Sequence, residues 1–195
     1  MKNSVEFLEK LNQELKVVGD NSKYVNEKYN LPDYERDLED IEQIIIHCTA
    51  AGTEGWENPM AEINYAMNPN HISKRGCATA SYHFYINQKG EVWQLVSMNY
   101  YTWNCGAGQN KNSVAICINH NGTDPNEITP ELYETLIDTI CYIMDKLDWG
   151  VDEFGIMDRI HFHRDYSPKL CPGAIDKEFL ISEVSEKYKS WGDNV

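Results

Sequence analysis

Two histidines, a lysine and a cysteine lie close together near the carboxyl end of the chain, within residues 161–173. This segment contains Ser167-Pro168 and Pro172-Gly173, and such pairs favour turns that bring the imidazole, amine and thiol groups toward one point. Imidazole and thiolate are ligands that Zn²⁺ prefers, and a site with three protein ligands leaves a fourth position open for water. The segment therefore predicts part of a catalytic metal site, whose remaining ligand comes from another part of the chain.

A further ligand is available where a predicted strand ends. The stretch 41–47 contains three consecutive isoleucines and ends at His47, which predicts a buried strand whose terminal histidine points into a cleft. His47, Cys171 and a histidine at position 161 or 163 would then supply three ligands from two distant segments. Alternation along a strand places His161 and His163 on the same face, so the residues by themselves favour neither.

The elements that must position these ligands follow from the spacing of apolar residues along the chain. Strands are predicted at residues 41–47, 81–96 (as a hairpin), 114–118 and 156–162, and helices at residues 58–70, 130–147 and 176–190. A chain of 195 residues is long enough for one sizeable core and short for two. We therefore expect an α/β fold with a central mixed β-sheet flanked by helices and a zinc cleft at one edge of the sheet.

Two side-chain orientations follow from the same periodicities. Within the hairpin, alternation predicts that Tyr82 shares a face with Phe84, whereas His83 and Tyr85 lie on the other face. In the final helix, the spacing of the apolar residues predicts that Phe179 faces the core.

The first 40 residues differ in character from the rest of the chain. Leucines at helical spacing after Ser4 predict a short helix, and the following stretch is acidic, polar and interrupted by Pro32. We expect residues 1–40 to form an N-terminal helix and an acidic linker, and residues 41–195 to form a catalytic domain that folds without them.

The composition excludes several kinds of partner. The net charge of −14, from 17 basic and 31 acidic residues, opposes binding to nucleic acid or to an anionic membrane. The sequence has no signal-peptide core and no run approaching the ~20 apolar residues of a membrane helix, so we expect synthesis in the cytoplasm. The six cysteines include no Cys-x-x-Cys pair, and we expect reduced thiols and a monomer.

Four motifs occur in an order that resembles one enzyme family. They read Ile-Ile-His-Cys-Thr-Ala, then Tyr-His-Phe-Tyr-Ile followed by Lys-Gly-Glu, then Asn-Ser-Val-Ala-Ile-Cys-Ile, and finally His-Arg-Asp-Tyr-Ser-Pro-Lys-Leu-Cys-Pro-Gly. Together they resemble the zinc-dependent N-acetylmuramoyl-L-alanine amidases, a family that includes phage endolysins, bacterial autolysins and the animal peptidoglycan recognition proteins. The resemblance covers about residues 41–190.

This resemblance implies hydrolysis of the amide between N-acetylmuramic acid and L-alanine, by a phage-type lysin or autolysin that acts on the bacterial cell wall. Two alternatives within the resemblance are a cytoplasmic amidase that recycles wall muropeptides and a module that binds peptidoglycan without cutting it. Non-catalytic relatives typically lose the cysteine ligand, and Cys171 is present here.

The resemblance also implies roles for individual residues. It makes His47, His163 and Cys171 the zinc ligands, and Tyr82 and Lys169 the catalytic residues. A thiolate ligand donates charge to zinc and weakens its Lewis acidity, so additional donors are needed to stabilise the oxyanion that forms during amide hydrolysis. A phenol and an ammonium group are suited to this.

Two positions depart from the family pattern. Cys117 occupies a position where other branches place a glutamate that acts as general base, and Asn104 occupies one where many members have histidine. A thiol in an apolar strand is a poor replacement for a carboxylate base, so the chain fits the branch that uses tyrosine and lysine. Asn104 and Asn112 belong to a glycine- and asparagine-rich loop, and we expect both to bind substrate.

Overall fold

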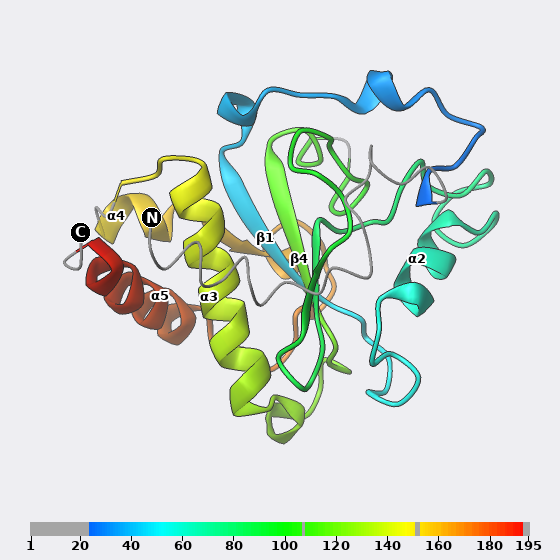
Figure 1. The fold of residues 1–195 in the computed structure, drawn as a ribbon. Coiled ribbons are helices and arrows are strands. Elements are labelled where there is room, and N and C mark those ends of the chain that lie inside the picture. Colours follow the sequence, from blue (N-terminus) through cyan, green and yellow to red (C-terminus); the bar gives the residue numbers. More distant parts are fainter. Residues whose placement is uncertain (1–23, 107, 151–152, 193–195) are drawn as a thin grey trace.

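A five-stranded mixed sheet lies at the centre of the computed structural model, which describes residues 24–106, 108–150 and 153–192 (Figure 1). The strand order is β3-β2-β4-β1-β5. The strands are β1 (Gln43–Cys48), β2 (Phe84–Ile86), β3 (Val92–Gln94), β4 (Ser113–Ile118) and β5 (Ile160–Phe162). Strand β1 is parallel to both β4 and β5, and β2 is parallel to β4, whereas β3 runs antiparallel to β2.

Helices cover both faces of the sheet. Helices α3 (Pro130–Lys146) and α5 (Lys177–Gly192) pack on one side, and α2 (Met60–Met67) lies on the other (Figure 1). The shorter helices are η2 (Leu31–Tyr34), η3 (Leu38–Asp40), η4 (Pro125–Glu127), α4 (Glu153–Met157) and η5 (His163–Asp165). The predicted α/β class, with a mixed sheet flanked by helices, is confirmed.

The alternation of side chains along strand β1 directs His47 away from the apolar core under α3 and α5. All six of its residues are buried, as expected for a central strand covered on both faces. Ile44 and Ile46 belong to the core under α3 and α5. Because side chains alternate along a strand, His47 points to the opposite face, where its register partner on β4 is Cys117.

The longest helix begins where its sequence signals predict. The Thr129 hydroxyl caps the first turn by accepting a hydrogen bond from the Leu132 N–H at 3.2 Å, and Pro130 occupies the first turn, where no backbone donor is needed. Leu132, Leu136 and Ile140 then recur at helical spacing and are fully buried. Helix α3 therefore holds the sheet from the side opposite His47.

Three expectations about local structure were wrong. Tyr82 packs with Tyr85 in the cluster on the α2 face, because β2 begins only at Phe84 and the residues before it bend. Phe179 is 56% exposed and stacks on Tyr133, since it lies on the outer side of the first turn of α5. Within the predicted strand 156–162, the first part is the end of α4, and β5 contains only the last three residues.

Residues 24–40 are attached to the domain by a half-buried arginine. The Arg36 guanidinium donates to the carbonyl oxygens of Met98 at 2.8 Å, Lys111 at 2.8 Å and Ser113 at 2.9 Å. Glu35 forms an isolated β-bridge with Tyr100. The boundary at residue 40 stays a prediction, and these contacts argue that the preceding residues contribute to the folded unit; the helix predicted after Ser4 lies outside the described residues.

None of the helices in the described part of the chain has the length and apolar character needed to cross a membrane. The structure has all six cysteines as free thiols.

Replacing Arg36 by methionine tests the attachment of this segment. Arg36→Met is expected to lower the free energy of unfolding by about 1–3 kcal/mol, because part-buried carbonyl oxygens lose their charged donor. Urea unfolding at fixed pH measures the change. Lys74→Met, which removes an exposed cation, is the control and is expected to change the stability by less than about 0.5 kcal/mol. Equal effects of the two variants would show that residues 24–40 are not held by Arg36.

Candidate metal centre

Three potential metal ligands converge at the carboxyl ends of adjacent strands. His47 is near the end of β1, His163 follows directly after β5, and Cys171 lies in the loop that follows η5. One ligand atom from each residue lies within 4.8 Å of the others. The His47 Nδ1 is 4.0 Å from the Cys171 Sγ, and the two imidazole centroids are 4.6 Å apart.

Hydrogen bonds within the 163–175 segment hold Cys171 in this position. The Arg164 backbone N–H donates to the Cys171 carbonyl oxygen at 2.8 Å, and the Arg164 guanidinium donates to the Gly173 carbonyl oxygen at 2.6 Å. Gly173 has φ of 83°, and a Cβ atom there would lie 2.1 Å from the Gly122 carbonyl oxygen. Only glycine allows this close approach, which brings the cysteine loop against the chain that leaves β4.

The protonation of the two histidines suits metal binding. Burial lowers the pKa of His47 well below its usual value, and it also lowers the pKa of His163, with Lys169 adding to the effect. Both imidazoles are therefore held neutral, which is the form that coordinates a metal ion. The Cys48 thiol, and burial after it, raise the pKa of Cys171, so this sulfur must release a proton when it binds a cation.

The donor set and its spacing fit zinc. Zn–N bonds of about 2.0 Å and Zn–S bonds of about 2.3 Å at tetrahedral angles put nitrogen and sulfur ligands about 3.5 Å apart. The observed 4.0 Å between His47 Nδ1 and Cys171 Sγ requires a contraction of only a few tenths of an ångström. The Cys48 N–H donates to Cys171 Sγ at 3.2 Å and would stabilise a thiolate there.

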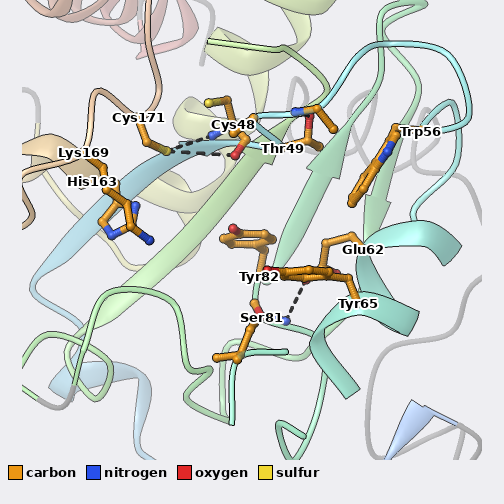
Figure 2. Close-up of a pocket in the computed structure, with 13 residues that line it drawn as sticks. Cys48, Thr49, Trp56, Glu62, Tyr65, Ser81, Tyr82, His163, Lys169 and Cys171 are labelled. Carbon is orange, nitrogen blue, oxygen red and sulfur yellow. Dashed lines mark hydrogen bonds between the residues drawn. The ribbon is translucent and has the colours of Figure 1, made fainter. Parts of the chain in front are cut away.

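A cleft of about 410 Å³ opens beside these ligands. Cys171, His163 and Lys169 lie along one side, Trp56, Glu62 and Tyr65 lie along the other, and Tyr82 lies between them (Figure 2). The Tyr82 ring centroid is 4.9 Å from that of His47. The structure thus brings the residues expected to bind the metal and the two expected to act in catalysis into one site.

His161 lies outside this group. Its Nε2 is 3.0 Å from the Asp158 carbonyl oxygen, and its Nδ1 is 3.6 Å from an Asp165 carboxylate oxygen. Alternation along a strand left His161 and His163 equivalent, and the end of β5 separates them in the structure, while His163 as a metal ligand stays a prediction. The strand stops at Phe162, and the turn into η5 redirects His163 toward His47.

The two loop asparagines do not line the cleft. The Asn112 side chain donates to the Glu42 carboxylate at 2.9 Å and accepts from the Gln43 amide at 3.0 Å. Asn104 is only 9% exposed and lies next to His47 rather than on the cleft surface. Their expected role in binding substrate stays a prediction.

Glu62 is a cleft residue that the sequence analysis did not identify. It is 3% exposed; its Oε1 accepts the Ser81 N–H at 3.0 Å, whereas its Oε2 is buried and has no hydrogen-bond partner among the described residues. Burial raises the pKa of this carboxyl to about 8. One sequence signal could have identified it: Glu62 lies four residues before Ala66, which places the acidic side chain on the buried face of α2.

An α/β sheet whose carboxyl edge carries a His-His-Cys group beside an open cleft defines a candidate metal-dependent enzyme. The model of the N-acetylmuramoyl-L-alanine amidase family matches residues 37–174. Since this is more than half of the chain, the protein belongs to the N-acetylmuramoyl-L-alanine amidase family.

Known proteins support this assignment at low identity. The chain is 27% identical over 149 residues to the N-acetylmuramoyl-L-alanine amidase XlyB of Bacillus subtilis, covering 73% of this chain and 40% of XlyB. The chain therefore spans less than half the length of this curated relative.

Solved structures share the fold. The endolysin amidase LysCS from Clostridium intestinale superposes with a TM-score of 0.58 at 20% identity, over 80% of this chain and 91% of LysCS. The peptidoglycan recognition protein PGRP-LB of Drosophila superposes with a TM-score of 0.52 at 21% identity, over 74% of this chain and 79% of PGRP-LB.

The buried Glu62 predicts a pH-dependent loss of stability. As the pH rises from about 4.5 toward 8, an unfolded glutamate ionises while folded Glu62 keeps its proton, so the folded state becomes less favoured by up to about 1.4 kcal/mol per pH unit. Glu62→Gln is expected to remove this loss, so the variant gains stability over the wild type across this range. Urea unfolding at a series of pH values and one zinc concentration measures it. Exposed Glu54→Gln is the control, and a Glu62→Gln profile parallel to wild type would contradict the prediction.

Proposed function

We propose that this protein is a zinc-dependent hydrolase that cleaves the amide bond between N-acetylmuramic acid and L-alanine in peptidoglycan. The observation that carries the proposal is the convergence of His47, His163 and Cys171 beside an open cleft, in a chain of the amidase family. The substrate is wall peptidoglycan, and the protein acts as a monomeric lysin or autolysin on the bacterial cell wall.

In this proposal His47 and His163 bind zinc through imidazole nitrogens and Cys171 binds it through the thiolate. A bound zinc ion would supply Lewis acidity toward the scissile carbonyl and lower the pKa of a coordinated water. The protein contributes neutral imidazoles, since burial lowers the pKa of both histidines. It also contributes the Cys48 N–H, which orients the cysteine sulfur.

Tyr82 and Lys169 are placed to stabilise negative charge on the substrate carbonyl oxygen. Burial, followed by the nearby Cys117, raises the pKa of Tyr82 well above its usual value, so its hydroxyl stays protonated and can donate a hydrogen bond. Lys169 lies exposed on the ligand side of the cleft and close enough to lower the pKa of His163. Donors that are already in place when charge develops contribute most to such a reaction.

The opposite side of the cleft provides contacts for the rest of the substrate. Trp56 and Tyr65 line this side, Ile72 also lines the cleft, and Tyr65 and Ile72 are 50% and 43% exposed. Exposed aromatic and apolar side chains next to a polar catalytic group bind the apolar faces of sugars and the side chains of peptides. A muramyl peptide offers both kinds of surface on either side of its scissile amide.

The zinc assignment predicts metal content for individual variants. Purified protein is expected to contain one zinc per chain, and His47→Ala, His163→Ala and Cys171→Ala are each expected to lose it, because two protein ligands hold zinc poorly. Metal analysis of dialysed samples measures this. His161→Ala is the matched control and is expected to keep the metal; loss of zinc from His161→Ala but not from His163→Ala would reverse the ligand assignment.

The roles of Tyr82 and Lys169 predict a loss of turnover without a loss of metal. Tyr82→Phe and Lys169→Ala are expected to retain zinc and peptidoglycan binding while turnover falls by ~10²-fold to 10³-fold, as for removal of one oxyanion donor. Digestion of purified walls and of soluble muropeptides, with mass spectrometry of the products, measures turnover and shows whether new L-alanine amino termini form. Full activity in either variant would remove that residue from the mechanism, and a wild-type protein that binds walls without cutting them would favour a recognition module.

A further inference from the structure

Two hydrogen bonds tie an irregular, buried segment beside the cleft to helix α2. Residues 77–81 belong to no helix or strand, and each of them is at most 3% exposed. The Cys77 N–H donates to the Ala66 carbonyl oxygen at 2.8 Å, and the Ser81 N–H donates to the Glu62 Oε1 at 3.0 Å (Figure 2). Buried backbone donors outside regular structure need such partners, so α2 determines the path of this segment.

Tyr82 lies between two anchored residues. On one side of it, Ser81 is bonded to α2 through Glu62. On the other side, the His83 N–H donates to the carbonyl oxygen of Ala115 on β4 at 2.9 Å. The backbone therefore passes from the helix to the sheet across one residue, and the Tyr82 side chain enters the cleft at that point.

The Glu62 carboxyl is placed to hold this backbone rather than to touch substrate. Glu62 is 3% exposed although it lines the cleft, and its Oε2 is buried. Its Oε1 bonds the residue directly before Tyr82. An acidic side chain is costly to bury, and an apolar one would pack between α2 and the sheet without that cost. The use that the structure shows for this carboxyl is the acceptor that it provides for Ser81.

We propose that Glu62 is a positioning residue whose Oε1 holds the Ser81 N–H, so that the Tyr82 hydroxyl stays directed at the reacting carbonyl. The inference rests on the proposed function, in which Tyr82 donates to the developing oxyanion. Misplacing a catalytic group by about 1 Å costs ~10²-fold in rate, so an anchor one residue away affects turnover without touching substrate.

Turnover of two Glu62 variants provides the first test. Glu62→Met removes the acceptor at similar size, and its kcat on soluble muropeptides is expected to fall ~10-fold to 10²-fold at unchanged KM and zinc content. Glu62→Gln keeps an acceptor oxygen and is expected to restore most of the wild-type kcat. Wild-type kcat in Glu62→Met would overturn the inference. Equal losses in both variants would also overturn it, because the carboxyl would then act by its own chemistry.

The Tyr82→Phe background tests whether Glu62 acts through Tyr82. In that background the hydroxyl whose position matters is already absent. Adding Glu62→Met to Tyr82→Phe is therefore expected to lower kcat by less than about 2-fold further. Losses that multiply, as two independent sites give, would contradict the proposal.

Thr129 provides the matched control for a lost side-chain acceptor. Its hydroxyl accepts the Leu132 N–H at 3.2 Å on α3, which packs on the other face of the sheet. Thr129→Val is expected to lower the stability, as Glu62→Met does, and to keep the wild-type kcat. An equal loss of kcat in Thr129→Val would overturn the inference, because the effect of Glu62 would then be a general loss of stability.

Amide hydrogen exchange tests the anchor itself and requires no catalytic activity. In the wild-type protein the Ser81 N–H is expected to be protected, a measurement that does not depend on any variant folding. Glu62→Met is expected to speed this exchange ~10-fold or more, while the His83 N–H, bonded to β4, keeps its rate.

Fast exchange of the wild-type Ser81 N–H, or exchange that Glu62→Met leaves unchanged, would sink the proposal. A wild-type protein that cuts no muropeptide would overturn the proposed function instead. The exchange measured on the same sample would still decide whether Glu62 holds the segment before Tyr82.

Discussion

The parallel pairing of β1 with β5 is the constraint on which the candidate site depends. In a parallel pair the carboxyl ends of both strands lie at the same edge of the sheet, so the register of Ile46 with Phe162 places His47 and His163 beside each other. The cysteine loop then needs only to fold back over this edge, and Arg164 and Gly173 hold it there. A change of one residue in this register would turn His47 into the apolar core under α3 and destroy the ligand group.

Burial determines the chemistry of the groups around this edge. It keeps the His47 imidazole neutral, keeps the Tyr82 hydroxyl protonated and raises the pKa of the Glu62 carboxyl to about 8. These shifts share their largest cause, because the low-dielectric interior penalises the charged form of each group. The exposed Lys169 is then the cationic side chain that lines the cleft. The groups available to a substrate carbonyl are therefore hydrogen-bond donors rather than anions.

Cys117 stands where other branches of the family place a glutamate, and in this protein a carboxyl group near that position comes from a different element, helix α2. Cys117 is fully buried opposite His47, and burial together with the nearby Glu62 raises the pKa of its thiol. Helix α2 therefore places the Glu62 carboxyl group beside Cys117, at a position where β4 itself carries no carboxylate. Sequence position alone does not reveal this arrangement, since residues 62 and 117 are joined only by the packing of α2 on the sheet.

Local sequence signals predict the fold class, the order of the main strands and helices, and two members of the candidate metal group, His47 and Cys171, whereas alternation leaves His161 and His163 equivalent. These follow from local signals: the buried isoleucine run before His47, the capped α3, and a closely spaced motif that contains His163 and Cys171. Tertiary structure alone decided the ring orientations and the surroundings of each group. Tyr82 lies on the opposite face from the one predicted, because β2 starts later than alternation implies. Asn104 and Glu62 lie near the site because segments distant in the sequence pack around it. Such contacts depend on where strands end and how helices pack, which the local period of apolar residues does not specify.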